Sequence, residues 1–203
     1  MQETEYMDRL ILALRKKYKE GQSAQDAIGE NISIGMHKVA LYKESLFNGI
    51  CSILLPENLR DMPYPEVIIK YPDINRPQVI KTNQNGNASI TFSTLPIENA
   101  GSNEGALEKL KKIRCDMKKV WKQNVFYDMG DVQAQELTVA WMDFRAFTLT
   151  ESLYCMIFIF KPEEEMILGN FHCGFSEYDI WKPAVLKLLT TIRTKGQGLS
   201  EKR

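Results

Sequence analysis

The stretch from residue 135 to residue 194 constrains the fold more than any other part of the chain. It contains three long runs with the two-residue alternation of β-strands, and then a helical pattern that begins near Asp179. The middle run, residues 153–160, is apolar on both faces, which is typical of a central strand covered on both sides. The final helix carries Pro183 in its first turn. Its expected buried stripe is Trp181, Val185, Leu188, Leu189 and Ile192.

Two hairpins are indicated upstream of this stretch. Asn-Gly at 48–49 joins apolar runs at 39–45 and 50–56, and Asn-Gly at 85–86 lies at the tip of a second hairpin within 79–94. This dipeptide between apolar runs is the strongest short-range hairpin signal, because both residues adopt positive φ easily. Residues 67–72 are interpreted as a short strand, and residues 125–130 as a brief strand and turn.

Two further helices are predicted. Residues 3–19 place Met7, Leu10, Ile11, Leu14 and Tyr18 on one helical face, and the polar stretch 22–32 follows as a linker. Residues 103–124 form the clearest helical pattern, with Asn103 as the expected N-cap. Its apolar stripe is Ala106, Leu110, Ile113, Met117, Val120 and Trp121.

These elements predict one α+β domain at residues 31–195, with a central, mostly antiparallel sheet on which helices pack. Residues 1–30 are its N-terminal helix and linker, and residues 196–203 a flexible tail. A chain of 203 residues buries enough surface to fold without a metal or a disulfide. The four cysteines are accordingly expected to be mostly buried free thiols in a reducing compartment.

Composition and charge narrow the possible functions. Lys+Arg and Asp+Glu are equal at 26 each, so no net field attracts nucleic acid or an anionic membrane. The longest apolar run has eight residues, at 153–160, whereas a membrane-spanning helix needs about 20. The first residues show no apolar signal-peptide core. We therefore expect a cytoplasmic protein without membrane insertion.

The sequence contains no strong catalytic signature. The only histidines are His37 and His172, and His172 and Cys173 alternate on one strand, so they point to opposite faces and form no local dyad. The acidic run 163–165 is interpreted as a solvated hairpin turn, and neither a metal-ligand spacing nor a glycine-rich phosphate loop is found. We expect no cofactor and favour a non-enzymatic protein.

Two groups of residues remain as candidate sites. In the strand that begins near 137, Asp143 and Arg145 share the face of Trp141, so either a bulge lies near Met142 or one end of that face is polar and accessible. A small-ligand or enzymatic site there, with Tyr154, would require a concave pocket and a carboxylate of shifted pKa.

The other group consists of Arg76, Lys81, Asn83 and Asn85, on and beside the second hairpin. It is either a recognition loop or ordinary turn chemistry. The basic face of 103–124 is interpreted as solvated rather than as a nucleic-acid site, because no aromatics are interleaved for base stacking.

The order of elements and some of the residues resemble the PsbP-like α/β/α fold. The similarity covers about 39–193 and rests on F-N-G-x-C-S-I-L-L-P at 47–56, the long strands 135–175, and a terminal helix that opens with W-K-P at 181–183. This fold is shared by the photosystem II extrinsic subunit, the Ran-binding nuclear import factor and the bacterial DcrB family. The resemblance implies no catalytic residues.

The resemblance implies a protein-binding module, since members of the fold are protein-interaction subunits and one bacterial branch shields apolar helices of secreted effectors. We therefore expect an adaptor or chaperone of a bacterium whose partner is another protein; a homodimer is compatible with the same sequence, and nucleic acid is disfavoured. The chaperone version predicts an exposed apolar patch on the sheet, larger than a few hundred Å².

Overall fold

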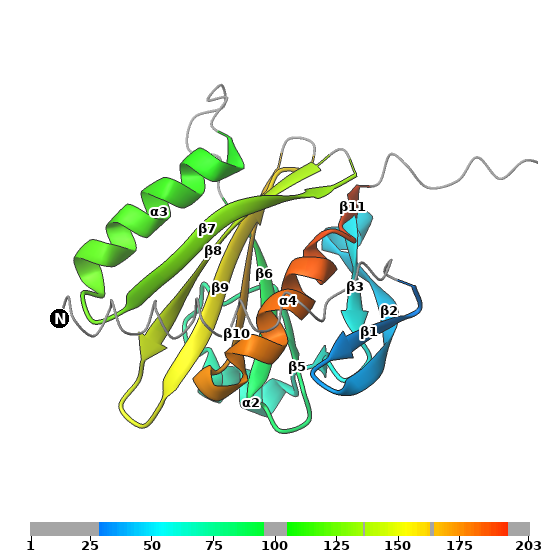
Figure 1. Cartoon of the computed structure of the whole chain (residues 1–203), viewed down its shortest axis with the longest axis horizontal. Coiled ribbons are helices and arrows are strands. Elements are labelled where there is room, and N and C mark those ends of the chain that lie inside the picture. Colours follow the sequence, from blue (N-terminus) through cyan, green and yellow to red (C-terminus); the bar gives the residue numbers. More distant parts are fainter. Residues whose placement is uncertain (1–28, 96–104, 136, 163–164, 195–203) are drawn as a thin grey trace, which may run out of the picture.

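Two antiparallel sheets form the framework of the computed structural model, which describes residues 29–95, 105–135, 137–162 and 165–194 (Figure 1). The smaller sheet has the order β1-β2-β3-β11. Its strands are β1 (Asn31–Ile34), β2 (His37–Leu46), β3 (Cys51–Pro56) and β11 (Arg193–Thr194). A 3₁₀ turn, η1 (Phe47–Gly49), joins β2 to β3 with Asn48 at φ 56° and Gly49 at φ 87°, which confirms the first hairpin.

The larger sheet has seven strands in the order β4-β5-β6-β10-β9-β8-β7. These are β4 (Arg60–Asp61), β5 (Val79–Thr82), β6 (Ala88–Leu95), β7 (Val125–Ala134), β8 (Leu137–Phe147), β9 (Ser152–Phe160) and β10 (Met166–Gly174). The three consecutive long strands expected from the sequence are β8, β9 and β10, and β9 is buried on both faces between the other two. Gly86, at φ 68°, turns the β5–β6 hairpin as predicted.

Helices cover both faces of the larger sheet. Helix α4 (Tyr178–Leu189), preceded by the 3₁₀ turn η2 (Phe175–Glu177), contacts strands of both sheets, and Figure 1 shows it crossing one face of the larger sheet beside the smaller one. The main core joins Ile53 of β3, Phe171 of β10 and Trp181 of α4. Helix α3 (Ala106–Val120) packs on the opposite face, where Leu110 contacts Met142 and neighbouring residues. The architecture is therefore the expected α+β arrangement of helices on a central antiparallel sheet.

Several local predictions were wrong. Residues 67–72 do not form a strand, because α2 (Tyr64–Lys70) occupies this position. Pro65 lies in its first turn, where a missing N–H costs no helical bond. The segment from 125 is a ten-residue strand, β7, rather than a brief strand and turn. Pro183 lies beyond the first turn of α4, inside the helix.

Other predictions fall outside the residues that the structure describes, namely the helix 3–19, most of the linker, Asn103, residues 163–164 and the tail 196–203. Gly105 is the N-cap of α3. The short strands β1 and β11 were not anticipated from the sequence.

Candidate functional site

A buried ionic network lies between β8 and α4, where the sequence placed Asp143 among its candidates. The Asp143 side chain is fully buried. One carboxylate oxygen accepts the backbone N–H of Asp128 at 2.8 Å, and the other accepts the hydroxyl of Tyr154 at 3.1 Å and contacts the Lys182 ammonium at 2.6 Å. Burial raises the pKa of Asp143 above its ordinary value, although Lys182 opposes the shift.

Lys182 reaches this network from α4. Its ammonium also pairs with Asp128 at 2.7 Å and lies over the rings of Trp141, at 5.3 Å, and Tyr178, at 5.9 Å. Burial alone would lower the pKa of Lys182, but the two carboxylates outweigh burial and raise it. The network therefore contains one cation and two carboxylates, and it fastens α4 to the face of β8 and β9.

The sequence left open whether a bulge or an accessible polar end explains Asp143 and Arg145. The β8 alternation is unbroken, and the irregularity lies in the neighbouring strand, between Phe126 and Met129 of β7. This bulge brings the backbone N–H of Asp128 onto the buried Asp143 carboxylate. The polar face is consequently closed over at Asp143 rather than open.

Arg145 lies further along the same face of β8. Its guanidinium donates to the Ser152 hydroxyl at 3.1 Å and lies between the rings of Phe147, at 4.8 Å, and Phe175, at 4.1 Å. The structure thus places Trp141, Asp143 and Arg145 on one face, as the alternation predicted, and adds Lys182, which no local pattern linked to them. Both oxygens of the Asp143 carboxylate are bound by donors of the chain itself. A ligand-binding or catalytic role for Trp141, Asp143 and Arg145 stays a prediction.

The second candidate group is not brought together as one site. Lys81 is buried and pairs with Glu44 of β2 at 2.8 Å, which ties β5 to the smaller sheet, and with Asp61 of the neighbouring β4 at 2.9 Å. Asn83 holds the hairpin, because its side-chain oxygen accepts the N–H groups of residues 87 and 88 at 3.1 and 3.2 Å. Asn85 is exposed at the tip, and Arg76 lies 5.9 Å from the Tyr64 ring.

His172 lies on the α3-side face of the larger sheet, and Cys173 points to the opposite, core face, as predicted. Burial, with a smaller contribution from Lys70, lowers the pKa of His172 to about 4. Burial likewise raises the pKa of the Cys51 and Cys155 thiols to about 12, and that of Cys173 above its ordinary value. These thiols are therefore poor nucleophiles, and Cys115 is the exposed one.

The lowered pKa of His172 makes stability depend on pH. The folded protein keeps this imidazole neutral, whereas the unfolded chain takes up a proton below pH 6.5, so the free energy of unfolding falls as pH drops from 6.5 toward 4. We expect a loss of about 2–3 kcal/mol over this interval, after allowance for partial exposure. Urea unfolding at a series of pH values should show a smaller slope for His172→Gln. His37→Gln, at an exposed position, is the control, and an unchanged slope in His172→Gln would contradict this assignment.

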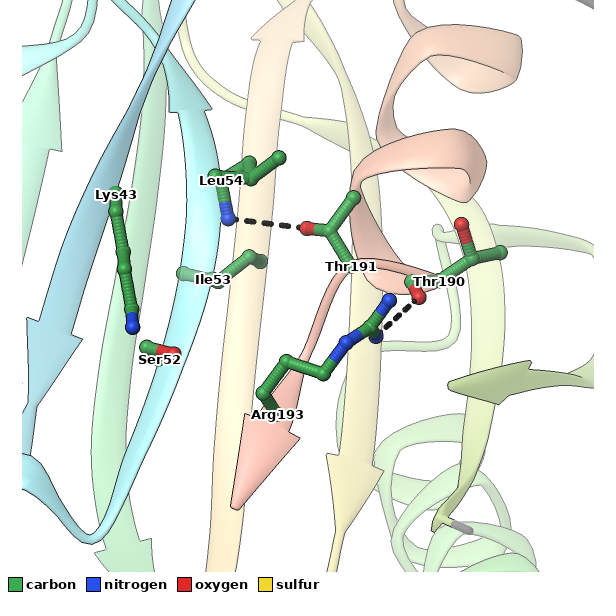
Figure 2. Close-up of a pocket in the computed structure, with 7 residues that line it drawn as sticks. All are labelled: Lys43, Ser52, Ile53, Leu54, Thr190, Thr191 and Arg193. Carbon is green, nitrogen blue, oxygen red and sulfur yellow. Dashed lines mark hydrogen bonds between the residues drawn. The ribbon is translucent and has the colours of Figure 1, made fainter. Parts of the chain in front are cut away.

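A cleft of about 460 Å³ lies where the end of α4 meets β3 (Figure 2). Its polar groups join these two elements: the Thr191 hydroxyl accepts the Leu54 N–H at 3.0 Å and donates to the Leu188 carbonyl at 2.6 Å. Arg193 donates to the carbonyls of Thr190 and Ile192, both at 2.8 Å. On this side of β3, β11 already pairs with residues 51–52, and the proline at position 56 has no N–H. Few backbone N–H and C=O groups are therefore left with which an added strand could pair.

A surface of exposed apolar side chains lies on α2 and the loop that follows it. It consists of Tyr64, Ile68, Ile69 and Ile74, which are 66, 46, 79 and 93% exposed, and is called the α2 apolar surface below. The contact of Arg76 with Tyr64 keeps the loop beside the helix. Sequence reasoning missed this surface, because a strand at 67–72 would have buried alternate side chains.

Among the described residues, no group of His, Cys, Asp and Glu is arranged to hold a metal ion. No helix in the described ranges is long and apolar enough to cross a membrane. The described cysteines are all free thiols.

With two antiparallel sheets, α4 on one face and α3 on the other, the chain has the PsbP-like α/β/α fold. It is similar to the solution structure of cyanobacterial PsbP (CyanoP) from Synechocystis sp. PCC 6803, with a TM-score of 0.54 and 10% identity over 86% of this chain and 99% of that one. It is also similar to the Ran-binding protein Mog1p of Saccharomyces cerevisiae, with a TM-score of 0.51 and 8% identity over 77% of this chain and 96% of that one.

At these identities the likeness shows the fold alone, and it confirms the resemblance inferred from the sequence. No family model matches the chain, and no curated protein matches it.

Proposed function

We propose that this protein is a protein-binding module and that the α2 apolar surface is where its partner docks. The observation that carries the proposal is that α2 buries none of its side chains. A seven-residue helix normally owes its stability to an apolar face packed on the rest of the protein. Here that contribution is small, and the isoleucines point outward instead.

The exposed apolar side chains are concentrated on this segment. Four of the nine large apolar side chains that are exposed in the described residues lie between 64 and 74. Each isoleucine contributes roughly 1.5–3 kcal/mol when it is transferred completely from water to an apolar contact. A partner that covers three isoleucines and a tyrosine would therefore gain enough apolar burial for specific association, after its own ordering costs.

The chaperone hypothesis was wrong about where the exposed apolar patch lies. It predicted an apolar patch on the sheet, but Phe147 is the only large exposed apolar side chain in a described strand. The partner is instead expected to contact a short helix and loop. We propose an adaptor or chaperone-like role in the cytoplasm of a bacterium, with a partner segment that presents apolar side chains.

One structural neighbour supports this class of function. Mog1p is a Ran-binding protein, so this fold is compatible with recognition of another protein. Nucleic-acid binding through the basic face of α3 is a weaker candidate than protein binding. Several cations of this face already contact other groups of the chain. Lys119 pairs with Asp116 at 2.8 Å, and Arg114 and Lys118 lie within 6 Å of the Phe126 ring, at 5.9 and 5.5 Å.

Ile69→Lys should abolish capture of the partner without unfolding the protein, because it places a charge on the apolar surface at a side chain that is 79% exposed. Tagged wild-type protein should retain one stoichiometric partner from cells of its source at moderate salt, and Ile69→Lys should retain at least tenfold less. Leu149→Lys is the matched control, since Leu149 is fully exposed in the β8–β9 turn.

Equal capture by Ile69→Lys and wild type, or capture by neither, would contradict the proposal. Capture that disappears at high salt in both proteins would point instead to nucleic-acid binding through the basic face of α3. Recovery of a second copy of this chain alone would make the surface a homodimer interface.

A further inference from the structure

The cleft of about 460 Å³ where α4 ends against β3 is lined by two cationic side chains, those of Lys43 and Arg193. We propose that this cleft binds a phosphate monoester of a small organic molecule, with the phosphate above the Ser52 hydroxyl and between the two cations. The cleft shares no residue with the α2 apolar surface, so the inference goes beyond the proposed function and does not depend on it.

Strand register places the three polar residues on one face of the smaller sheet. Lys43 of β2 lies opposite Leu54 of β3. Ser52 of β3 lies opposite Arg193 of β11. Directly opposite residues share a face, and so do residues two apart in a strand, such as Ser52 and Leu54. Because Ile53 between them is buried in the core, the polar side chains lie on the outer face, and Figure 2 shows Ser52 between Lys43 and Arg193.

The three side chains are close enough to contact one anion. Strands β2 and β11 pair with opposite edges of β3, so they lie about 10 Å apart at ordinary strand spacing. Lys43 is diagonal to Ser52 across the β2–β3 pair, a position from which a long side chain reaches its neighbour. Arg193 approaches Ser52 from the other side. A phosphate above Ser52 can therefore contact both cations and the hydroxyl.

No carboxylate among the residues that line the cleft balances the charge of Lys43. Within the described ranges, the Lys43 ammonium forms no ion pair and the Ser52 hydroxyl forms no hydrogen bond. Glu44, the next residue of β2, belongs to the other face of the strand, where it pairs with Lys81 at 2.8 Å. Like charges on neighbouring strands destabilise a sheet, so an anion between Lys43 and Arg193 would relieve their repulsion.

Arg193 is held in place before a ligand binds. Its Nη1 donates to the carbonyls of Thr190 and Ile192, both at 2.8 Å. A guanidinium has N–H donors on all three nitrogens in a fixed fork, so those on Nε and Nη2 remain for an anion. Because the two bonds already fix the fork, less side-chain entropy is lost when an anion binds.

Charge and volume together indicate the class of ligand. A phosphate monoester carries about −1.5 to −2 charges at pH 7, which matches two cations better than the single charge of a carboxylate. The cleft volume of about 460 Å³ lies in the range of small-molecule sites, which leaves room for an organic group in contact with Leu54. An extended phosphopeptide is disfavoured, because few backbone groups on this side of β3 are left to pair with it.

A titration followed by amide chemical shifts tests the inference on the full-length protein at pH 8. Phenyl phosphate should shift the amide resonances of Lys43, Ser52 and Arg193 and bind with a Kd on the order of 1 mM. Benzoate, which has one charge, should bind about tenfold more weakly. Inorganic phosphate, which has no organic group, should bind about threefold more weakly.

Three variants separate this site from the general charge of the surface. Lys43→Met preserves the side chain's length and removes the cation, so the Kd for phenyl phosphate should rise about tenfold while the fold is kept. Arg193→Gln retains amide donors for the α4 carbonyls and should also raise the Kd about tenfold. Lys38→Met removes an exposed cation from the same strand, outside the cleft, and should leave the Kd unchanged.

Four results would overturn the inference. The first is that neither phosphate compound shifts these amides at about 20 mM, well above the expected Kd. The second is that Lys43→Met and Lys38→Met weaken binding equally, since the surface as a whole would then attract the anion. Equal affinity for benzoate would exclude the preference for a doubly charged group. Equal affinity for inorganic phosphate would mean an adventitious ion only.

Discussion

Lys182→Met is expected to lower the free energy of unfolding by about 3–5 kcal/mol at pH 7. The substitution preserves the side chain's length but leaves the fully buried Asp143 carboxylate without the ammonium that contacts it at 2.6 Å. Tyr154 and the Asp128 N–H would still donate to this carboxylate, but neither neutralises it. Urea denaturation of the two proteins at equal concentration measures the difference.

The pH dependence of this variant identifies the cause. Burial already raises the pKa of Asp143, and loss of Lys182 raises it further. A carboxyl whose folded pKa lies above its unfolded value costs stability once pH exceeds the unfolded value of about 3.9, so the deficit of Lys182→Met should shrink near pH 4.

Two variants control for this effect. Lys187→Met, in the last turn of the same helix, should change stability by no more than about 0.5 kcal/mol. Adding Asp143→Asn to Lys182→Met should restore most of the loss, because the remaining partner is neutral. A loss below about 1 kcal/mol in Lys182→Met would mean that water reaches the carboxylate and that the network does not fasten α4.

Gly169→Ala is expected to cost about 3 kcal/mol, because β10 passes the ring of Phe158 too closely for a side chain. A Cβ at this position would lie 2.0 Å from Cε2 of Phe158. That ring is fully buried and packs edge-on against Phe92 at 5.8 Å, so it cannot move without disturbing the core. Thermal or urea unfolding of the variant measures the cost.

The nearby Gly174→Ala provides the comparison. A Cβ there would meet its nearest atom, the Ser176 hydroxyl oxygen, at 3.8 Å, so stability should stay within about 0.5 kcal/mol of wild type. Combining Gly169→Ala with Phe158→Leu should recover part of the lost stability by removing ring atoms. Equal stability of Gly169→Ala and Gly174→Ala would contradict the close approach of β10 to Phe158.

Local chemistry explains which parts of the fold were predictable from sequence. The Asn-Gly pairs at 48–49 and 85–86 specify tight turns, and the alternation in 137–147 assigns Trp141, Asp143 and Arg145 to one face. The spacing in 106–117 marks the packed part of the α3 stripe in the same way. The end of that prediction was wrong, because α3 stops at Val120 rather than 124, and Val120 and Trp121, expected on the stripe, are 69 and 47% exposed. Each of these signals depends on residues only a few positions apart.

Interactions between distant segments explain what could not be predicted. Lys182 and Asp143 are far apart in the chain, and neither neighbourhood indicates the pair. Consecutive β-branched residues at 67–69 favour a strand, but Pro65 lies in the first turn of a helix that includes them. The segment forms α2, and its isoleucines form a surface that strand periodicity would not reveal.

Photo-cross-linking from position 69 tests whether another protein docks on the α2 apolar surface. Ile69 would be replaced by a benzophenone amino acid in the tagged protein within cells of its source, with the same replacement at Leu149 as the control. We expect an intermolecular adduct with one other protein from position 69 and none from position 149. Identical adducts from both positions, or no intermolecular adduct from position 69, would contradict a partner-binding role for the α2 apolar surface.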